Sequence, residues 1–278
     1  MANDTTDPQE SQGKLTPEAS GHISANGLQM YYEAYGAGQP LILLHGGTAT
    51  VGSWHDQIPA FARHFRTIAI DSRGHGKTDN PSGELSYAAM ADDVAAFIRA
   101  MKINAPIVLG FSDGAQIALE FALRHPGLAR ALVLGGAYYR FSKQYQDGLR
   151  RFGFEGPDEN GGTAHIREVP DEWAESLRQE HARAGDPDYW KTLMDQIAVL
   201  WWTPLNYTFE DFLKISVPTL IVSGDREEAS EVEQSVEMYR MIPKAELFIV
   251  PNAGHMQSAA QMSNALVLEF LQRNNTAI

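Results

Sequence analysis

The stretch that decides the fold is IVLGFSDGAQIALEFAL, which runs from Ile107 to Leu123. An apolar run over 106–109 is typical of a strand that is buried on both faces. It leads into residues 110–114, Gly-Phe-Ser-Asp-Gly, which fit the pattern G-x-S-x-G. Apolar residues then recur with helical spacing over 115–124, and Pro126 ends this predicted helix. We therefore expect a strand, a sharp turn and a helix in direct succession.

Ser112 stands at the centre of this turn. A serine on a tight strand-to-helix turn has an unfavourable backbone conformation, and neighbours without a Cβ let the strand and the helix close around it. Its hydroxyl then stands clear of the sheet, beside the free amides of the helix N-terminus. The pentapeptide alone also occurs in ordinary loops, so the prediction of a nucleophile depends on the flanking strand and helix.

Composition limits the possible classes of protein. A chain of 278 residues can bury one large core, or one core with an inserted subdomain. Hydrophobic residues make up 44% of the chain, as is usual for a globular protein. The net charge of −13 makes nucleic acid and anionic membrane surfaces improbable partners. The absence of cysteine excludes disulfides, a thiolate nucleophile and a cysteine-bound metal.

The N-terminal region has the composition of a flexible leader. Residues 1–20 are polar and rich in Pro, Ser, Thr and Gly. The first seven residues lack the basic and apolar regions of a signal peptide, and no apolar run in the chain has the length of a membrane span. We therefore expect a cytoplasmic protein with no membrane partner.

The rest of the chain alternates between predicted strands and helices. Asn26-Gly27 predicts a hairpin between strands at 22–24 and 28–35. Such alternation with continuous apolar strands predicts an α/β fold, with a mostly parallel sheet and helices on both faces. Further strands are expected at 40–45, 67–71, 130–134, 218–223 and 246–250, and helices at 53–64, 86–101 with Ser86 as N-cap, 231–241 and 258–273.

The alternation stops over residues 138–213, which are rich in tryptophan, tyrosine and phenylalanine. We interpret this segment as an inserted helical cap, so that the core consists of 21–137 and 214–278. Its aromatic side chains are expected to line a mostly apolar pocket above Ser112. For Trp201 and Trp202 a structural role is the alternative, in which they pack the cap onto the sheet.

Five motifs over nearly all of the chain after residue 22 support one resemblance. They are His45-Gly-Gly47, Asp71-Ser-Arg-Gly-His-Gly76, Gly110-Phe-Ser-Asp-Gly114, Gly224-Asp-Arg-Glu227 and Ala253-Gly-His255. With these motifs the chain resembles the α/β-hydrolase fold superfamily, in its serine-nucleophile branch with a helical cap. The order serine, acid, histidine is the order used by this family.

A serine hydroxyl needs a base to accept its proton, and imidazole titrates near working pH. Of the nine histidines, His255 follows a late strand in a Gly-His pair and is the predicted base. The resemblance gives His45 and His75 structural roles in loops, and His125 is a candidate partner of a helix dipole. No pair of histidines has ligand spacing with a carboxylate, so we expect no metal and no cofactor.

The acid that orients the imidazole has three candidates. In the family it usually lies three residues after the glycine that ends its strand, and this position holds Glu227, where aspartate is commoner. Glutamate is longer by one methylene, so its loop would lie farther from His255. Asp225 is the first alternative, and Glu228 lies close by.

Backbone amides must point at the charge that develops on the carbonyl oxygen. One amide is expected from Asp113, and the resemblance places the other at Gly47. We expect the Asp113 side chain to face away, because a carboxylate near the oxyanion would oppose it. In the family the loop over 71–76 braces the oxyanion strand. Gly76-Lys-Thr78 does not form a phosphate loop, because the first glycine of that motif would fall at Asp71.

The leading prediction is a cofactor-independent serine hydrolase that cleaves a small carboxylic ester or lactone through an acyl-enzyme. Serine at position 112 argues against the family's dehalogenases and epoxide hydrolases, which use aspartate. Three alternatives stay open: a carbon–carbon bond hydrolase of a keto-dienoate, a hydrolase-like receptor for a small ligand, and a cofactor-free perhydrolase. The first alternative needs a cation for the substrate carboxylate, for which Arg140, Arg150 and Arg151 are candidates.

Overall fold

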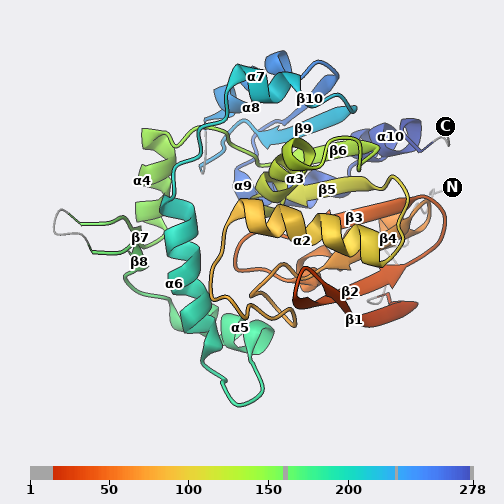
Figure 1. The fold of residues 1–278 in the computed structure, drawn as a ribbon. Helices are drawn as coiled ribbons and strands as arrows, with labels where there is room; N and C mark the ends of the chain where they lie inside the picture. The colour runs from red at the N-terminus through yellow and green to blue at the C-terminus, as the bar shows by residue number, and fades with distance from the viewer. Residues whose placement is uncertain (1–14, 159–161, 229–230, 276–278) are drawn as a thin grey trace, which may run out of the picture.

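The structure is a computed structural model that describes residues 15–158, 162–228 and 231–275. Its centre is an eight-stranded sheet with the order β1-β2-β4-β3-β5-β6-β9-β10 (Figure 1). β1 and β2 are antiparallel to their neighbours, and the other strands run parallel. The predicted α/β fold with a mostly parallel sheet is confirmed. The strands are β1 (Ala19–Ala25), β2 (Leu28–Tyr35), β3 (Pro40–Leu44), β4 (Arg66–Ile70), β5 (Ile107–Phe111), β6 (Ala131–Gly135), β9 (Thr219–Gly224) and β10 (Ala245–Val250).

The central strands are apolar throughout because both of their faces are covered. Successive side chains of a strand point to opposite faces. Ile42 of β3 and Val108 of β5 belong to one apolar cluster, whereas Leu43 and Leu109 belong to another. All four side chains are fully buried. A sheet with two buried faces needs helices on each side.

Helices cover both faces of the sheet. α2 (Tyr87–Ala100), α3 (Asp113–Arg124) and α8 (Val232–Met241) bury their apolar sides in the cluster of Ile42. Figure 1 shows α2 and α3 side by side across the sheet. The 3-10 helix η1 (Val51–Trp54), α1 (Ile58–Ala62) and α10 (Ala265–Arg273) pack in the cluster of Leu43 on the opposite face.

Two helices that we predicted as continuous are broken. The helix expected over 53–64 is divided into η1 and α1, with Pro59 in the first turn of α1, where a missing N–H costs little. The helix expected over 258–273 consists of α9 (His255–Ala260), η2 (Gln261–Ser263) and α10. Asn264 causes the second break, because its side chain accepts the Leu266 amide at 3.0 Å and so starts a new helix.

The N-terminal hairpin differs from prediction only in its length. β1 begins at Ala19, where our prediction had a leader over 1–20 and a strand from 22. Ala19 pairs with Ala34, so the last two residues of the predicted leader belong to the sheet. Its first 14 residues lie outside the described residues. Asn26 and Gly27 both have positive φ, at 50° and 76°, as the predicted two-residue turn requires.

The segment between β6 and β9 has an apolar cluster of its own. Phe154, Leu177, Leu193 and Ile197 are buried in it. Figure 1 shows α4, α5 and α6 together at one side of the sheet. The elements are α4 (Lys143–Arg151), β7 (Phe154–Glu155), β8 (His165–Ile166), α5 (Asp171–His181), α6 (Tyr189–Trp202) and α7 (Phe209–Leu213).

Two details of this segment were not predicted. β7 and β8 form a small antiparallel sheet of two residues each, too short for any periodicity to indicate it. Phe212 of α7 packs in the cluster of Ile42, together with Met238 of α8. α7 therefore rests on the helices of the main sheet. The division into a core and a cap at 138 and 213 stays a prediction.

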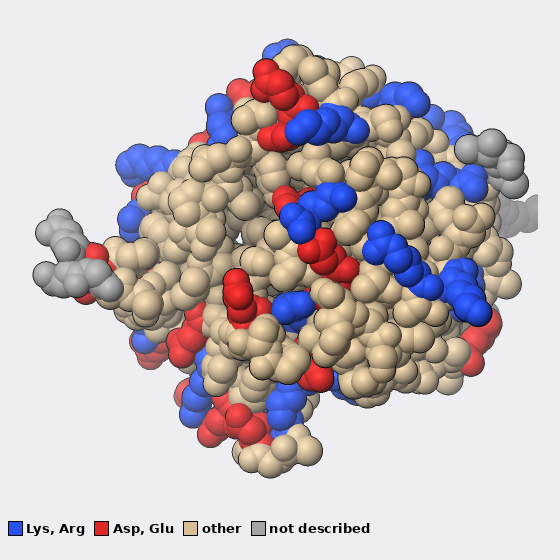
Figure 2. All heavy atoms as spheres, viewed as in Figure 1, with Lys and Arg blue, Asp and Glu red and all other residues tan. Residues whose placement is uncertain are grey.

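The outer face shown in Figure 2 mixes acidic and basic side chains. Arg124 and Asp92 form one exposed ion pair of the protein, with 2.7 Å between nitrogen and oxygen. In the part of the chain that the structure describes, no helix is both long and apolar enough to cross a membrane.

Candidate active site

The turn between β5 and α3 consists of Ser112 alone. Its φ of 55° and ψ of −120° lie in a region that residues with a side chain rarely adopt. A Cβ on Gly110 would lie 2.0 Å from the Gly114 carbonyl oxygen, and one on Gly114 would lie 2.0 Å from the carbonyl oxygen of Leu44. Both positions therefore require glycine, as the sequence predicted. The Ser112 amide donates to the Gly135 carbonyl at 2.8 Å, which ties the turn to β6.

Ser112 is presented for reaction. The residue is only half-buried. Among the described residues, its side chain makes no capping hydrogen bond to α3, although it stands at the N-cap position. The hydroxyl is thus left available beside a helix N-terminus, where partial positive charge favours a developing anion.

His255 lies over the same turn. It is the first residue of α9, which begins three residues earlier than the helix we predicted there. Its ring packs on Phe111, the residue before Ser112, with 4.8 Å between ring centroids. A Cβ on Gly136 would lie 2.7 Å from its Cε1 atom. Gly136 follows Gly135, whose carbonyl accepts the Ser112 amide. The imidazole that lies against Gly136 is therefore held beside the turn.

The three acidic candidates make three different contacts around His255. Oε1 of Glu227 lies 2.8 Å from Nδ1 of His255, and the Glu227 side chain is fully buried. Asp225 accepts the Ala253 amide at 3.3 Å, and 37% of its side chain is exposed. Glu228 accepts the backbone amide of His255 at 2.8 Å. The structure therefore brings Glu227 to the imidazole, whereas Asp225 and Glu228 hold the backbone around it.

The loop after β3 passes close to Ser112. A Cβ on Gly46 would lie 3.8 Å from the Ser112 hydroxyl oxygen, and Gly47 follows directly. His45 supports this loop, with Nδ1 2.7 Å from the Gly46 carbonyl and Nε2 accepting the Ser72 amide at 3.0 Å. Burial lowers the pKa of His45 to about 4, so its ring is neutral at pH 7 and holds both contacts.

The side chain of Asp113 lies against this loop, and whether it faces away from the oxyanion stays a prediction. A Cβ on Gly47 would lie 2.6 Å from Oδ2 of Asp113. The carboxylate is held there by the Tyr87 hydroxyl, which donates at 2.8 Å, and by the indole N–H of Trp201, also at 2.8 Å. These two donors reduce the cost of a buried charge at this point.

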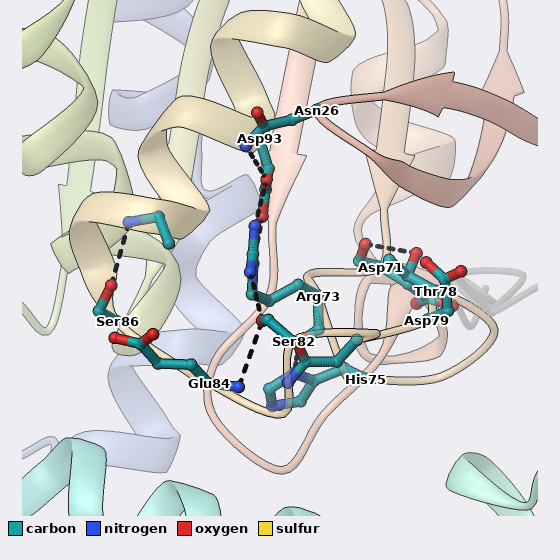
Figure 3. A network of polar contacts seen from close by, with 12 residues as sticks. Asn26, Asp71, Arg73, His75, Thr78, Asp79, Ser82, Glu84, Ser86 and Asp93 are labelled. Carbon is teal, nitrogen blue, oxygen red and sulfur yellow. Dashed lines mark hydrogen bonds and ion pairs between the residues drawn. The ribbon is translucent and has the colours of Figure 1, made fainter.

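The loop over 71–86, which follows β4, holds a network of polar contacts (Figure 3). Asp71 accepts the amides of Val51 and Lys77, both at 2.8 Å, and so ties this loop to the one after β3. Arg73 points at Asp93 of α2 and binds both of its oxygens, at 2.7 and 2.8 Å. These contacts agree with the structural role that the resemblance implies for this loop, which is to brace the oxyanion strand. We call this segment the bracing loop.

His75 also lies in the bracing loop and is buried. Its Nδ1 lies 3.0 Å from the Arg73 carbonyl. His181 of α5 packs its ring edge-on against His75, accepts the Gly76 amide at 2.9 Å and contacts the Thr48 carbonyl at 3.0 Å. Burial lowers the pKa of both histidines. His181 therefore links α5 to the loops after β3 and β4.

A cavity of about 490 Å³ lies beside the loop after β3. Its lining includes Thr48 and His55 from the sheet side and Trp173, Leu177 and Glu180 from α5. Trp173 is the one aromatic residue of the predicted cap in this lining. Trp201 binds Asp113 of the main sheet's helix α3, which agrees with the packing role we considered for it, and Trp202 packs on Phe141. Among the residues that the structure describes, no group of His, Cys, Asp or Glu side chains is arranged to hold a metal ion.

Sequence reasoning missed the residues that support the site. Gly136 was indicated only by the Gly135-Gly136 pair at the end of an apolar strand. No local pattern indicated that Tyr87 and Trp201 bind Asp113, because they lie 26 and 88 residues from it along the chain. Contacts over such separations are made only when the segments pack.

Comparisons with known proteins agree with this architecture. Residues 39–259 match the family model described as alpha/beta hydrolase fold. The chain is 29% identical over 267 residues to a 2-hydroxy-6-oxo-6-(2'-aminophenyl)hexa-2,4-dienoic acid hydrolase of Metapseudomonas resinovorans, with 90% of each chain covered.

Two solved structures are similar in fold and sequence. A serine hydrolase involved in carbazole degradation has a TM-score of 0.71 and 28% identity, covering 92% of this chain and 99% of that one. Est816, an enzyme that degrades N-acyl homoserine lactones, has a TM-score of 0.66 and 25% identity, covering 91% and 98%.

Proposed function

The chain belongs to the α/β-hydrolase fold family, and on this basis we propose that it is a cofactor-independent serine hydrolase that cleaves a small carboxylic ester or lactone. One observation carries the proposal. The fully buried carboxylate of Glu227 lies 2.8 Å from the imidazole of His255, and that imidazole packs beside the strained turn of Ser112. A serine, a base and an acid that orients the base are the parts that acyl transfer needs.

In the proposed reaction the Ser112 hydroxyl attacks the substrate carbonyl while His255 accepts its proton. Glu227 holds the imidazole in the required tautomer and stabilises the imidazolium. The amides of Gly47 and Asp113 donate to the oxyanion. His255 then protonates the leaving alcohol, which leaves an acyl group on Ser112. Water, deprotonated by His255, attacks this ester and releases the carboxylic acid.

A second candidate is hydrolysis of a carbon–carbon bond in a keto-dienoate. The name of the relative from Metapseudomonas resinovorans favours it. The cations we considered for the substrate carboxylate do not add support, because all three are exposed. Arg140 pairs with Glu237 at 3.0 Å and Arg150 with Asp147 at 3.3 Å, while Arg151 donates to the Glu228 carbonyl. We therefore rank the ester or lactone first.

The test is a burst experiment with p-nitrophenyl butyrate. Wild type is expected to release one nitrophenolate per enzyme rapidly and then to turn over more slowly, because the acyl-enzyme accumulates. Ser112→Ala should lose both phases, and its folded state should be checked by its thermal unfolding midpoint. Mass spectrometry after a phosphonate inhibitor should place the label on Ser112.

The outcomes separate the candidates. Full turnover after complete labelling of Ser112, or a burst retained in Ser112→Ala, would refute the serine mechanism. Turnover of a keto-dienoate with no hydrolysis of any ester or lactone would favour the second candidate. Tight binding of a small ligand that survives Ser112→Ala, with no turnover, would point to a receptor.

A further inference from the structure

The carboxylate of Asp113 is the feature of the site that the proposed reaction does not use. The residue is 6% exposed and lies in the first turn of α3, directly after Ser112. Trp201 donates its indole N–H to both carboxylate oxygens, at 2.9 and 2.8 Å, and the Tyr87 hydroxyl donates to Oδ1 at 2.8 Å. Both oxygens accept, which is the pattern of the ionised form.

This carboxylate lies against the proposed oxyanion loop. A Cβ on Gly47 would meet Oδ2 of Asp113 and Cζ2 of Trp201, each at 2.6 Å. The charge therefore sits on the Cα side of the residue whose amide is proposed to bind the oxyanion. A substrate carbonyl held by that amide brings its acyl group into the field of Asp113.

No positive charge compensates Asp113 directly. In the described residues, no Lys or Arg nitrogen lies within 4.0 Å of its oxygens. Glu227 adds a second carboxylate to the site, 2.8 Å from His255. Burial raises the pKa of Asp113, while the hydrogen bonds from Trp201 and Tyr87 oppose this shift. A carboxylate on the substrate would add another negative charge in a partly desolvated place.

We propose that Asp113 is a specificity-determining residue, which excludes acyl groups that carry a carboxylate close to the reacting carbonyl. The substrate's acyl part is then uncharged. This inference rests on the proposed serine hydrolase function and names the substrate class within it. Like charges brought together in an environment of low effective dielectric repel strongly, so the effect should appear in kcat/KM.

The experiment compares two ethyl esters of similar shape, monoethyl succinate and ethyl 4-methylpentanoate, by the ethanol that each releases. The measured quantity is the ratio of kcat/KM for the anionic ester to that for the neutral ester. Wild type should prefer the neutral ester by about tenfold or more. Asp113→Asn keeps the shape of the side chain and removes its charge, so the ratio should rise about tenfold.

Two further variants separate charge from packing. Trp201→Phe keeps the Asp113 side chain but removes a donor that lowers its pKa. At alkaline pH, where the carboxyl stays ionised, the ratio should therefore stay as low as in wild type or fall. Asp147→Asn removes one charge from an exposed side chain of α4, and its ratio should equal that of wild type. If Asp113→Asn does not fold, the wild-type ratio and Trp201→Phe still test the proposal.

The two proposals fail in different ways. Equal kcat/KM for both esters in wild type, or a ratio that does not rise in folded Asp113→Asn, would overturn the role of Asp113 and leave the serine hydrolase intact. A higher ratio in Trp201→Phe at alkaline pH would also overturn this role. Hydrolysis of neither ester, together with no nitrophenyl burst, would overturn both proposals.

Discussion

The bracing loop and the turn at Ser112 both carry polar groups. Those of Asp71 and Arg73 in the bracing loop are buried and hydrogen-bonded, whereas Ser112 is half-buried and its hydroxyl, in the described part of the chain, makes no capping bond to α3. Asp71 and Arg73 are 1% and 7% exposed, and each makes at least two short hydrogen bonds. Ser112 is half-buried, has a strained backbone and makes no capping bond within the described residues. Buried and fully paired groups stabilise a fold, whereas strain and an unused hydroxyl accompany chemistry.

The comparison shows why residue type alone misleads. By residue type alone, catalysis could be assigned to Asp71, Arg73 and His75 as readily as to Glu227 and His255. The partners of these three side chains are backbone amides, a backbone carbonyl, the Ser82 hydroxyl and the buried carboxylate of Asp93. Substitutions in this loop should therefore change stability, and substitutions at the proposed triad should change the rate.

The largest expected effect is on the rate. Glu227→Gln should lower kcat/KM by about 10³- to 10⁴-fold, because a neutral amide no longer stabilises the imidazolium. Asp225→Asn is the matched control, and its kcat/KM should change by less than about threefold, since Asp225 contacts the Ala253 backbone. Steady-state kinetics of both variants on p-nitrophenyl butyrate measure the difference. A larger loss in Asp225→Asn would make Asp225 the triad acid.

The next effect is on stability. Arg73→Leu should lower the free energy of unfolding by about 3–5 kcal/mol, because it leaves the buried carboxylate of Asp93 without its cation. Urea unfolding followed by circular dichroism gives this value. Arg124→Leu breaks the exposed pair with Asp92 and should cost about 0–1 kcal/mol. Equal costs for the two variants would show that burial does not distinguish the pairs.

Acidification should destabilise the loops that meet at His45. The unfolded ring binds a proton near its ordinary pKa of 6.5, but the folded ring does so only near 4, because it is buried. The stability contributed by the neutral ring is complete above about pH 6.5 and is lost as the pH falls towards 4. For His45 alone the loss at pH 5 is about 2 kcal/mol.

Urea unfolding at pH 8 and pH 5 tests this prediction. His45→Gln is expected to flatten the dependence on pH, since glutamine does not titrate. His75 and His181 shift in the same direction and should leave part of the slope in place. A wild-type stability that is constant or rises between pH 8 and pH 5 would contradict it.

The smallest effect is expected at the end of the bracing loop. The Ser86 hydroxyl accepts the Ala89 amide at 3.2 Å and caps α2 (Figure 3). Ser86→Ala should lower the free energy of unfolding by about 1 kcal/mol. Ser86→Asp retains the cap and should restore most of this loss, as urea unfolding would show. A loss of esterase activity in Ser86→Ala without loss of stability would contradict this prediction and show that the bracing loop affects the reaction rate.

Much of the architecture followed from local patterns. Continuous apolar runs predicted the parallel strands, because such strands are buried on both faces. Gly110 and Gly114 predicted the close approach of strand and helix at Ser112, and Asn26-Gly27 predicted the first hairpin. Ser86 marked the start of α2 through its capping hydrogen bond. In each case the cause lies within a few residues of its effect.

The remaining features were decided by packing between distant segments. Glu227, Asp225 and Glu228 are all carboxylates within four residues, and the choice among them depends on which side chain the folded loop turns towards His255. The orientation of Asp113 depends on Tyr87 and Trp201, which reach it from α2 and α6. Such choices need the tertiary structure, because hydrogen bonds between distant segments leave no periodicity in the sequence.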